Sequence, residues 1–128
     1  HRDLHSFPTR RSSDLLPHAP RAPRLLLRTD TFPDPDTFTT DFASLSPDLV
    51  HHLADQGVVL VGLDTPSVDP FTSKLLEAHA AVHRRDLAIL EGLLLAHVPD
   101  GLYTLVALPL HLVDADASPV RAVLLADD

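Results

Sequence analysis

Cysteine and methionine are both absent from this chain of 128 residues. Without cysteine, disulfides and thiolate chemistry are excluded, and the sequence carries no signal of its redox compartment. Without methionine there is no initiator residue, so we expect an incomplete reading frame. Long apolar runs are missing too: the longest, Ala122–Ala126, is far too short to cross a bilayer, and the N-terminus lacks the apolar core of a signal peptide.

Positive charge is scarce, because 10 Lys and Arg face 18 Asp and Glu, which gives a formal net charge of −8. This balance argues against nucleic acid or an anionic membrane surface as the main partner. Apolar residues make up 45% of the chain, which allows a packed core, and the length suits one small domain. We therefore expect a soluble, cytoplasmic protein.

The first fifteen residues differ from the rest of the chain. Residues 5–15 have the sequence HSFPTRRSSDL, which matches the translation of a common sequencing adapter. The alternative is a genuine basic tail rich in Ser and Arg, but a match of this length is specific. We expect residues 1–15 to be an adapter-derived artefact outside the fold, and residues 16–128 to form the folded domain.

The hydrophobic pattern predicts an α/β fold with a mixed sheet and flanking helices. Short apolar runs predict strands at residues 24–28, 58–63, 87–95, 102–108 and 120–125. Helices are predicted at residues 46–56 and 73–85. Ser46 can cap the first helix, Pro47 suits its first turn, and Gly57 suits its exit.

Glu91 is the most informative single residue, because it interrupts the apolar run of residues 87–95. Burying a lone carboxylate costs several kcal/mol unless it is paired or bound to a metal. Strand alternation could instead turn Glu91 to solvent, or it could pair with Arg84 or Arg85. His79 lies on the predicted helix that leads into this strand, so the two side chains could converge.

The remaining histidines give weaker signals. His79 and His83 have the i,i+4 spacing that lets one helix face hold zinc, but such pairs are common by chance in a chain with nine His. His51 and His52 are expected to be solvated positions of the first helix. His97 and His111 have no companion at metal spacing, and His18 lies in an irregular lead-in.

A polar cluster follows the predicted strand of residues 58–63, at the end where open α/β sheets place their sites. Asp64, Ser67 and Asp69 could line a site, or they could form Asx and Ser turns, with Asp69 helping to start the next helix. Both interpretations stay open. The sequence has no Gly-rich phosphate loop and no G-x-S-x-G elbow, so nucleophilic catalysis by a side chain has no support.

Together these motifs resemble the C-terminal half of the bacterial kynurenine formamidases, the arylformamidase branch of the cyclase-like metal hydrolases. The resemblance rests on VGLDTPSVDP at residues 61–70, Ser73–Lys74, His79 and ILEGL at residues 89–93. It extends to LLLRT at residues 25–29, ALPL at residues 107–110 and SPVRAV at residues 118–123. It therefore covers nearly all of residues 16–128.

The resemblance implies an incomplete cyclase-like domain of the swivelling β/β/α type. It implies hydrolysis of N-formyl-L-kynurenine to L-kynurenine and formate in tryptophan catabolism, with water activated by a divalent metal, usually zinc and often binuclear. His79 and Glu91 match the family's C-terminal pair of metal ligands at the family's spacing. His83 does not match a ligand position. The intact enzyme is expected to be a homodimer.

One departure from the family is serious. The motif H-x-G-T-H-x-D-x-P-x-H, which carries the other ligands and the acid/base His of the family, is absent from this chain. We therefore expect no catalytic acid or base here, and negligible formamidase activity from the chain alone. The substrate-binding residues are unknown, with Asp64, Ser67 and Asp69 as candidates.

Two other functions remain open. The first is another cyclase-like amide or ring hydrolase, such as an isatin-hydrolase type. The second is a non-catalytic acidic interaction domain, which would be favoured if Glu91 faced solvent far from His79.

Overall fold

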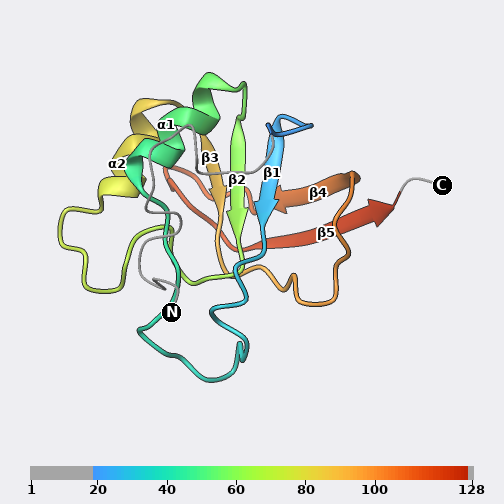
Figure 1. The fold of residues 1–128 in the computed structure, drawn as a ribbon, viewed down its shortest axis with the longest axis horizontal. Coiled ribbons are helices and arrows are strands. Elements are labelled where there is room, and N and C mark those ends of the chain that lie inside the picture. The colour runs from blue at the N-terminus through green and yellow to red at the C-terminus, as the bar shows by residue number, and fades with distance from the viewer. Residues whose placement is uncertain (1–18, 127–128) are drawn as a thin grey trace. The chain divides into compact units, whose positions relative to one another are not determined.

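The computed structural model describes residues 19–126, which form seven elements (Figure 1). Their order is β1 (Arg24–Leu27), α1 (Pro47–Asp55), β2 (Leu60–Leu63), α2 (Glu77–Arg84), β3 (Ala88–Leu90), β4 (Tyr103–Pro109) and β5 (Val120–Ala126). The expected α/β class is confirmed, with parallel and antiparallel pairing in separate sheets. The chain divides after His97 into two compact units, and each is described by itself.

The first unit is a parallel sheet with two helices. Its strand order is β1-β2-β3, so each strand lies beside its successor along the chain. The register pairs Leu25 with Val61 and Val61 with Ile89. Parallel neighbours need a long crossover, and here the two crossovers contain α1 and α2.

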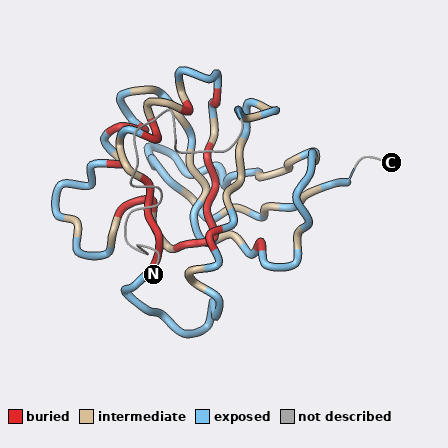
Figure 2. Tube along the Cα trace, in the orientation of Figure 1, coloured by how far each residue is buried: buried red, intermediate tan, exposed pale blue. Residues whose placement is uncertain are grey.

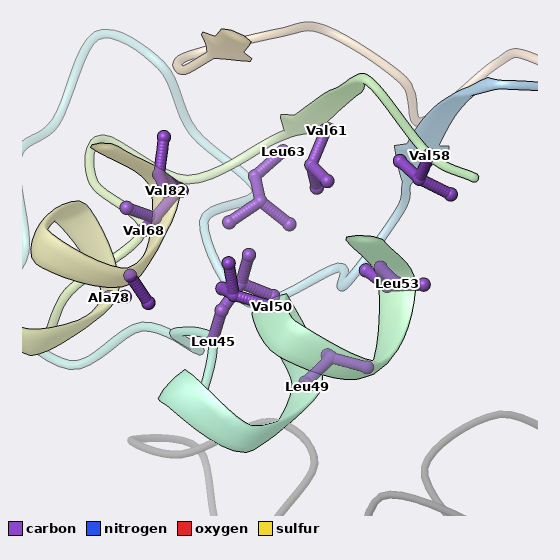
Figure 3. Close-up of a cluster of buried hydrophobic side chains, with 11 residues drawn as sticks. Leu45, Leu49, Val50, Leu53, Val58, Val61, Leu63, Val68, Ala78 and Val82 are labelled. Atoms are coloured by element: carbon purple, nitrogen blue, oxygen red, sulfur yellow. The ribbon is translucent and has the colours of Figure 1, made fainter. Parts of the chain in front are cut away.

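The core lies between β2 and the two helices (Figure 3). Strand alternation directs Val61 and Leu63 into this core, where both are completely buried. The other buried members are Leu45, Leu49, Val50, Leu53, Val58, Val68, Ala78, Ala81 and Val82. Figure 2 shows that buried residues follow β2 and continue into the segments around the helices. The end of β2 and the loop after it are thus held firmly.

Gly62 alternates to the other face of β2. A Cβ atom at this position would lie 2.5 Å from Leu26 Cδ2 and 2.7 Å from Leu93 Cδ1. Only glycine therefore lets these two leucine side chains approach the strand this closely.

The second unit is an antiparallel pair, β4 and β5, in which Tyr103 faces Ala126 and Pro109 faces Val120. None of the described residues after Leu95 is buried. Large apolar side chains such as Leu108 and Val113 remain exposed. Among residues 19–126, no helix has the length and apolar character needed to cross a membrane.

Two predicted boundaries were wrong, and both errors lie beside the candidate site. The second helix begins at Glu77 rather than Ser73, because Leu76 adopts a left-handed conformation (φ 49°) that is incompatible with a helix. The third strand ends at Leu90 rather than residue 95, because Gly92 turns the chain with a φ of 71°. The predicted artefact at residues 1–15 lies outside the described residues.

Candidate metal centre

The structure brings His79 and Glu91 together. His79 lies in the first turn of α2, and Glu91 directly follows the last residue of β3. The distance between His79 Nε2 and Glu91 Oε2 is 3.3 Å. Two ligands of one zinc ion lie about 3–4 Å apart, given metal–ligand bonds of roughly 2.0–2.2 Å. The two side chains are 35% and 29% exposed, so a cation can reach them.

Asp69 holds the other side of the His79 ring. Its Oδ2 atom lies 2.7 Å from His79 Nδ1 and accepts a hydrogen bond from the His79 backbone N–H (2.9 Å). Its Oδ1 atom accepts from the Ala78 N–H (2.8 Å). Asp69 therefore satisfies two backbone donors that the first turn of a helix leaves open. Part of the sequence hypothesis, that Asp69 helps to start this helix, agrees with these contacts.

The Asp69 contact determines which nitrogen of His79 is available. A carboxylate only accepts hydrogen bonds, so His79 Nδ1 must donate its proton to Asp69. Nε2 then presents its lone pair to Glu91 in the neutral ring. In the neutral ring, two acceptor atoms facing each other at 3.3 Å repel unless a proton or a metal ion lies between them. One imidazole nitrogen and one carboxylate oxygen are suitable donors for a divalent metal such as zinc.

Glu91 is fixed by the loop after β2. Its Oε2 atom accepts a hydrogen bond from the Val68 backbone N–H (2.8 Å). The turn that follows is held by Gly92 N–H donating to Thr65 O (2.8 Å) and Leu93 N–H donating to Leu63 O (3.0 Å). Glu91 is thus positioned at the carboxyl end of the sheet instead of inside a strand, and the lone buried carboxylate considered from the sequence does not arise.

Asp64 and Ser67 contact other parts of the protein. Both carboxylate oxygens of Asp64 accept from the Thr29 N–H (3.1 and 3.0 Å), and Oδ1 also accepts from Thr29 Oγ1 (2.7 Å). These bonds join the ends of β1 and β2. Ser67 Oγ accepts from the Asp69 N–H (3.1 Å). The Ser67 contact, two residues along the chain, is that of the turn interpretation, whereas the Asp64 bonds reach a different strand end. A substrate role for either residue stays a prediction.

The other histidines lie apart from this pair. In residues 19–126, no group of three or more His, Asp or Glu residues could hold a metal ion. His83, His97 and His111 are exposed, and His51 Nδ1 lies 3.3 Å from an Arg85 nitrogen. His18 is outside the described part of the chain. The chain therefore contributes two candidate ligands, fewer than a complete zinc site needs.

The sequence did not predict two contacts of this site, the Asp69–His79 ring bond and the Val68 N–H to Glu91. The only available signal was the expected helix-capping role of Asp69. A capping carboxylate lies against the first turn, and His79 occupies that turn.

Comparisons with known proteins show what this chain is similar to. Residues 16–70 match the family described as putative cyclase. Kynurenine formamidase from Bordetella petrii is 50% identical over 115 residues, which are 90% of this chain and 53% of the relative. Kynurenine formamidase from Paracidovorax citrulli is 52% identical over 101 residues, which are 79% of this chain and 47% of the relative. The chain thus spans about half the length of these curated relatives.

Solved structures agree with the sequence relatives. A predicted metal-dependent hydrolase from Bacillus stearothermophilus is 33% identical with a TM-score of 0.71, covering 79% of this chain and 48% of the other. A potential metal-dependent hydrolase with cyclase activity has the same identity, TM-score and coverage of this chain, and is covered over 49% of its own length. Over most of its length this chain is therefore similar to the bacterial kynurenine formamidases, and residues 16–70 match the cyclase family.

Proposed function

We propose that this chain is part of a metal-dependent amide hydrolase that converts N-formyl-L-kynurenine to L-kynurenine and formate. The observation that carries the proposal is the 3.3 Å approach of His79 Nε2 to Glu91 Oε2 in a chain 50–52% identical to kynurenine formamidases. A non-catalytic interaction domain would have no need to bring these two groups together. The higher identity to formamidases than to the 33% identical hydrolases favours this substrate over that of another cyclase-like enzyme.

His79 and Glu91 would hold one divalent metal, which we propose to be zinc. When bound, the metal polarises the formyl carbonyl and supplies a nucleophilic water at neutral pH. The further ligands and the acid/base His would come from the part of the enzyme that this chain does not span. As part of the same proposal, the intact enzyme is a cytoplasmic homodimer.

A chimera tests this function. In it, residues 16–128 replace the segment that they match in the Bordetella petrii relative. We expect hydrolysis of N-formyl-L-kynurenine that a chelator abolishes and zinc restores. His79→Ala and Glu91→Gln should each lower metal content and rate together, because the first removes a nitrogen donor and the second removes the negative charge of an oxygen donor.

His83→Ala is the matched control, since His83 lies on the same helix but is exposed and outside the pair. It should keep the metal content and rate of the parent chimera. A folded chimera without turnover would refute the substrate. Unchanged metal content in both His79→Ala and Glu91→Gln would refute the ligand assignment.

A further inference from the structure

Two consecutive residues, Val68 and Asp69, hold the two candidate ligands. The Val68 N–H binds Glu91 Oε2 at 2.8 Å, and Asp69 Oδ2 binds His79 Nδ1 at 2.7 Å. His79 and Glu91 come from different elements, a helix and the end of a strand. One short segment after β2 therefore sets the geometry of both.

We propose that Asp69 is a positioning residue that fixes the ring of His79, so that Nε2 faces Glu91 before any metal is bound. The metal part of this inference rests on the proposed function. The contact between Asp69 and the His79 ring does not rest on it, because that contact is present in the metal-free chain.

Burial makes the Asp69 bond effective. Asp69 is only 2% exposed, so water competes little for its carboxylate. A hydrogen bond to an ionised acceptor is roughly twice as strong as one between neutral groups. The His79 side chain is 35% exposed, and without this partner its ring could turn or carry its proton on Nε2. With Nδ1 donating to Asp69, the single proton of the neutral ring is held away from Nε2, the nitrogen that faces Glu91.

The segment itself is held on both sides. Val68 is completely buried, and its carbonyl oxygen accepts from the Leu45 N–H (2.8 Å). The Asp69 N–H donates to Ser67 Oγ (3.1 Å). Because these bonds fix the backbone, Asp69 can impose an orientation on His79 instead of following it.

The competing explanation is that Asp69 only caps α2 and does not position the His79 ring. A substitution at a second residue, Ser73, distinguishes these two roles. Ser73 Oγ accepts from the Leu76 N–H (3.0 Å) just before α2, so Ser73→Ala also removes a bond at this helix start. In the described structure, Ser73 makes no hydrogen bond to the His79 ring. Ser73→Ala therefore removes one hydrogen bond at the start of α2, where Asp69→Ala removes two, and it leaves the contact to the His79 ring intact.

The test uses the full 128-residue chain with ¹⁵N-labelled histidine, free of metal. The His79 signal is assigned by its loss in His79→Gln. We expect a proton on Nδ1 of His79 that exchanges slowly with water. Zinc is then added, and its affinity is read from the shift of the His79 Nε2 signal. Asp69→Ala should lose the slowly exchanging Nδ1–H and bind zinc about 10–100-fold more weakly, the usual cost of losing such a partner. Ser73→Ala should keep both properties.

An Nδ1 atom without a proton in the unsubstituted chain would overturn the proposal, and that measurement needs no variant. Equal zinc affinity in Asp69→Ala and the unsubstituted chain would also overturn it. If Asp69→Ala fails to fold, Asp69→Asn, which keeps the size of the side chain, replaces it, with the same two outcomes. A protonated Nδ1 in a chain that binds no zinc would support the role of Asp69 and count against the metal proposed above.

Discussion

Residues 19–97 enclose a core, whereas the described residues 98–126 leave their large apolar side chains partly or largely exposed. Leu53 and Val61 of the first unit are completely buried, while Leu108 and Val113 of the second are 73% and 80% exposed. An isolated two-stranded hairpin is at best marginally stable in water. Apolar residues of the two units thus have different surroundings, and the candidate site lies in the unit that supplies its own core.

The largest difference in stability between the two units is expected when one leucine in each is truncated to alanine. Leu53→Ala should lower the free energy of unfolding by about 2–5 kcal/mol, because it leaves a cavity in a packed core. Leu108→Ala, on the exposed hairpin, should change it by about 0.5 kcal/mol or less. Urea unfolding of the two variants measures both values. Equal losses would show that the hairpin has a core-like environment after all.

A smaller difference in stability is expected when one glycine in each unit is replaced by alanine. Gly62→Ala places a Cβ atom within 2.7 Å of both Leu26 Cδ2 and Leu93 Cδ1, so side chains must shift. Overpacking of this kind costs about 1–3 kcal/mol of unfolding free energy. Gly101→Ala is the control in the second unit, since its nearest contact, Tyr103 Cε2, would be at an ordinary 3.7 Å. Thermal unfolding compares the two, and a Gly62→Ala protein as stable as Gly101→Ala would contradict the close approach.

The elements of both units could be predicted because each is encoded locally. Ser46 accepts from the Leu49 N–H at 3.1 Å, which is the cap that the sequence predicted for α1. The order of all seven elements in residues 19–126 also agrees with the prediction. The start of α2 could not be predicted, because leucine rarely adopts the left-handed conformation that Leu76 has here (φ 49°) and no local pattern indicates it. An apolar run likewise does not reveal whether its faces are covered, as the hairpin shows.

The candidate site was predictable only in part. The spacing and resemblance indicated His79 and Glu91, and the structure brings their side chains within 3.3 Å. Their supports could not be inferred, because the Val68–Glu91 and Asp69–His79 bonds join residues 23 and 10 positions apart. Such contacts depend on how the loop after β2 folds back, and no local pattern encodes that path.

The smallest expected effect concerns charge at the edge of the first unit. Arg85, at the end of α2, donates hydrogen bonds to Asp55 and to the His51 carbonyl oxygen of α1. The hydrogen bond and the charge of Arg85 lower the pKa of Asp55 below its ordinary value of 3.8. A lowered pKa means that the ion pair stabilises the fold above this value, and that the contribution is lost as the pH falls through the lowered pKa.

Asp55→Asn should therefore be slightly less stable than the unsubstituted chain near neutral pH, and the gap should close as the solution is acidified below about 3.8. The effect should be small and weaken with added salt, because Asp55 is exposed. Unfolding free energies measured across this pH range provide the test. Asp116→Asn in the exposed hairpin is the control, since no ion pair is recorded for it among the described residues, and it should show no such closure. A gap for Asp55→Asn that persists unchanged into acid would mean that the stability difference does not arise from the charge of Asp55.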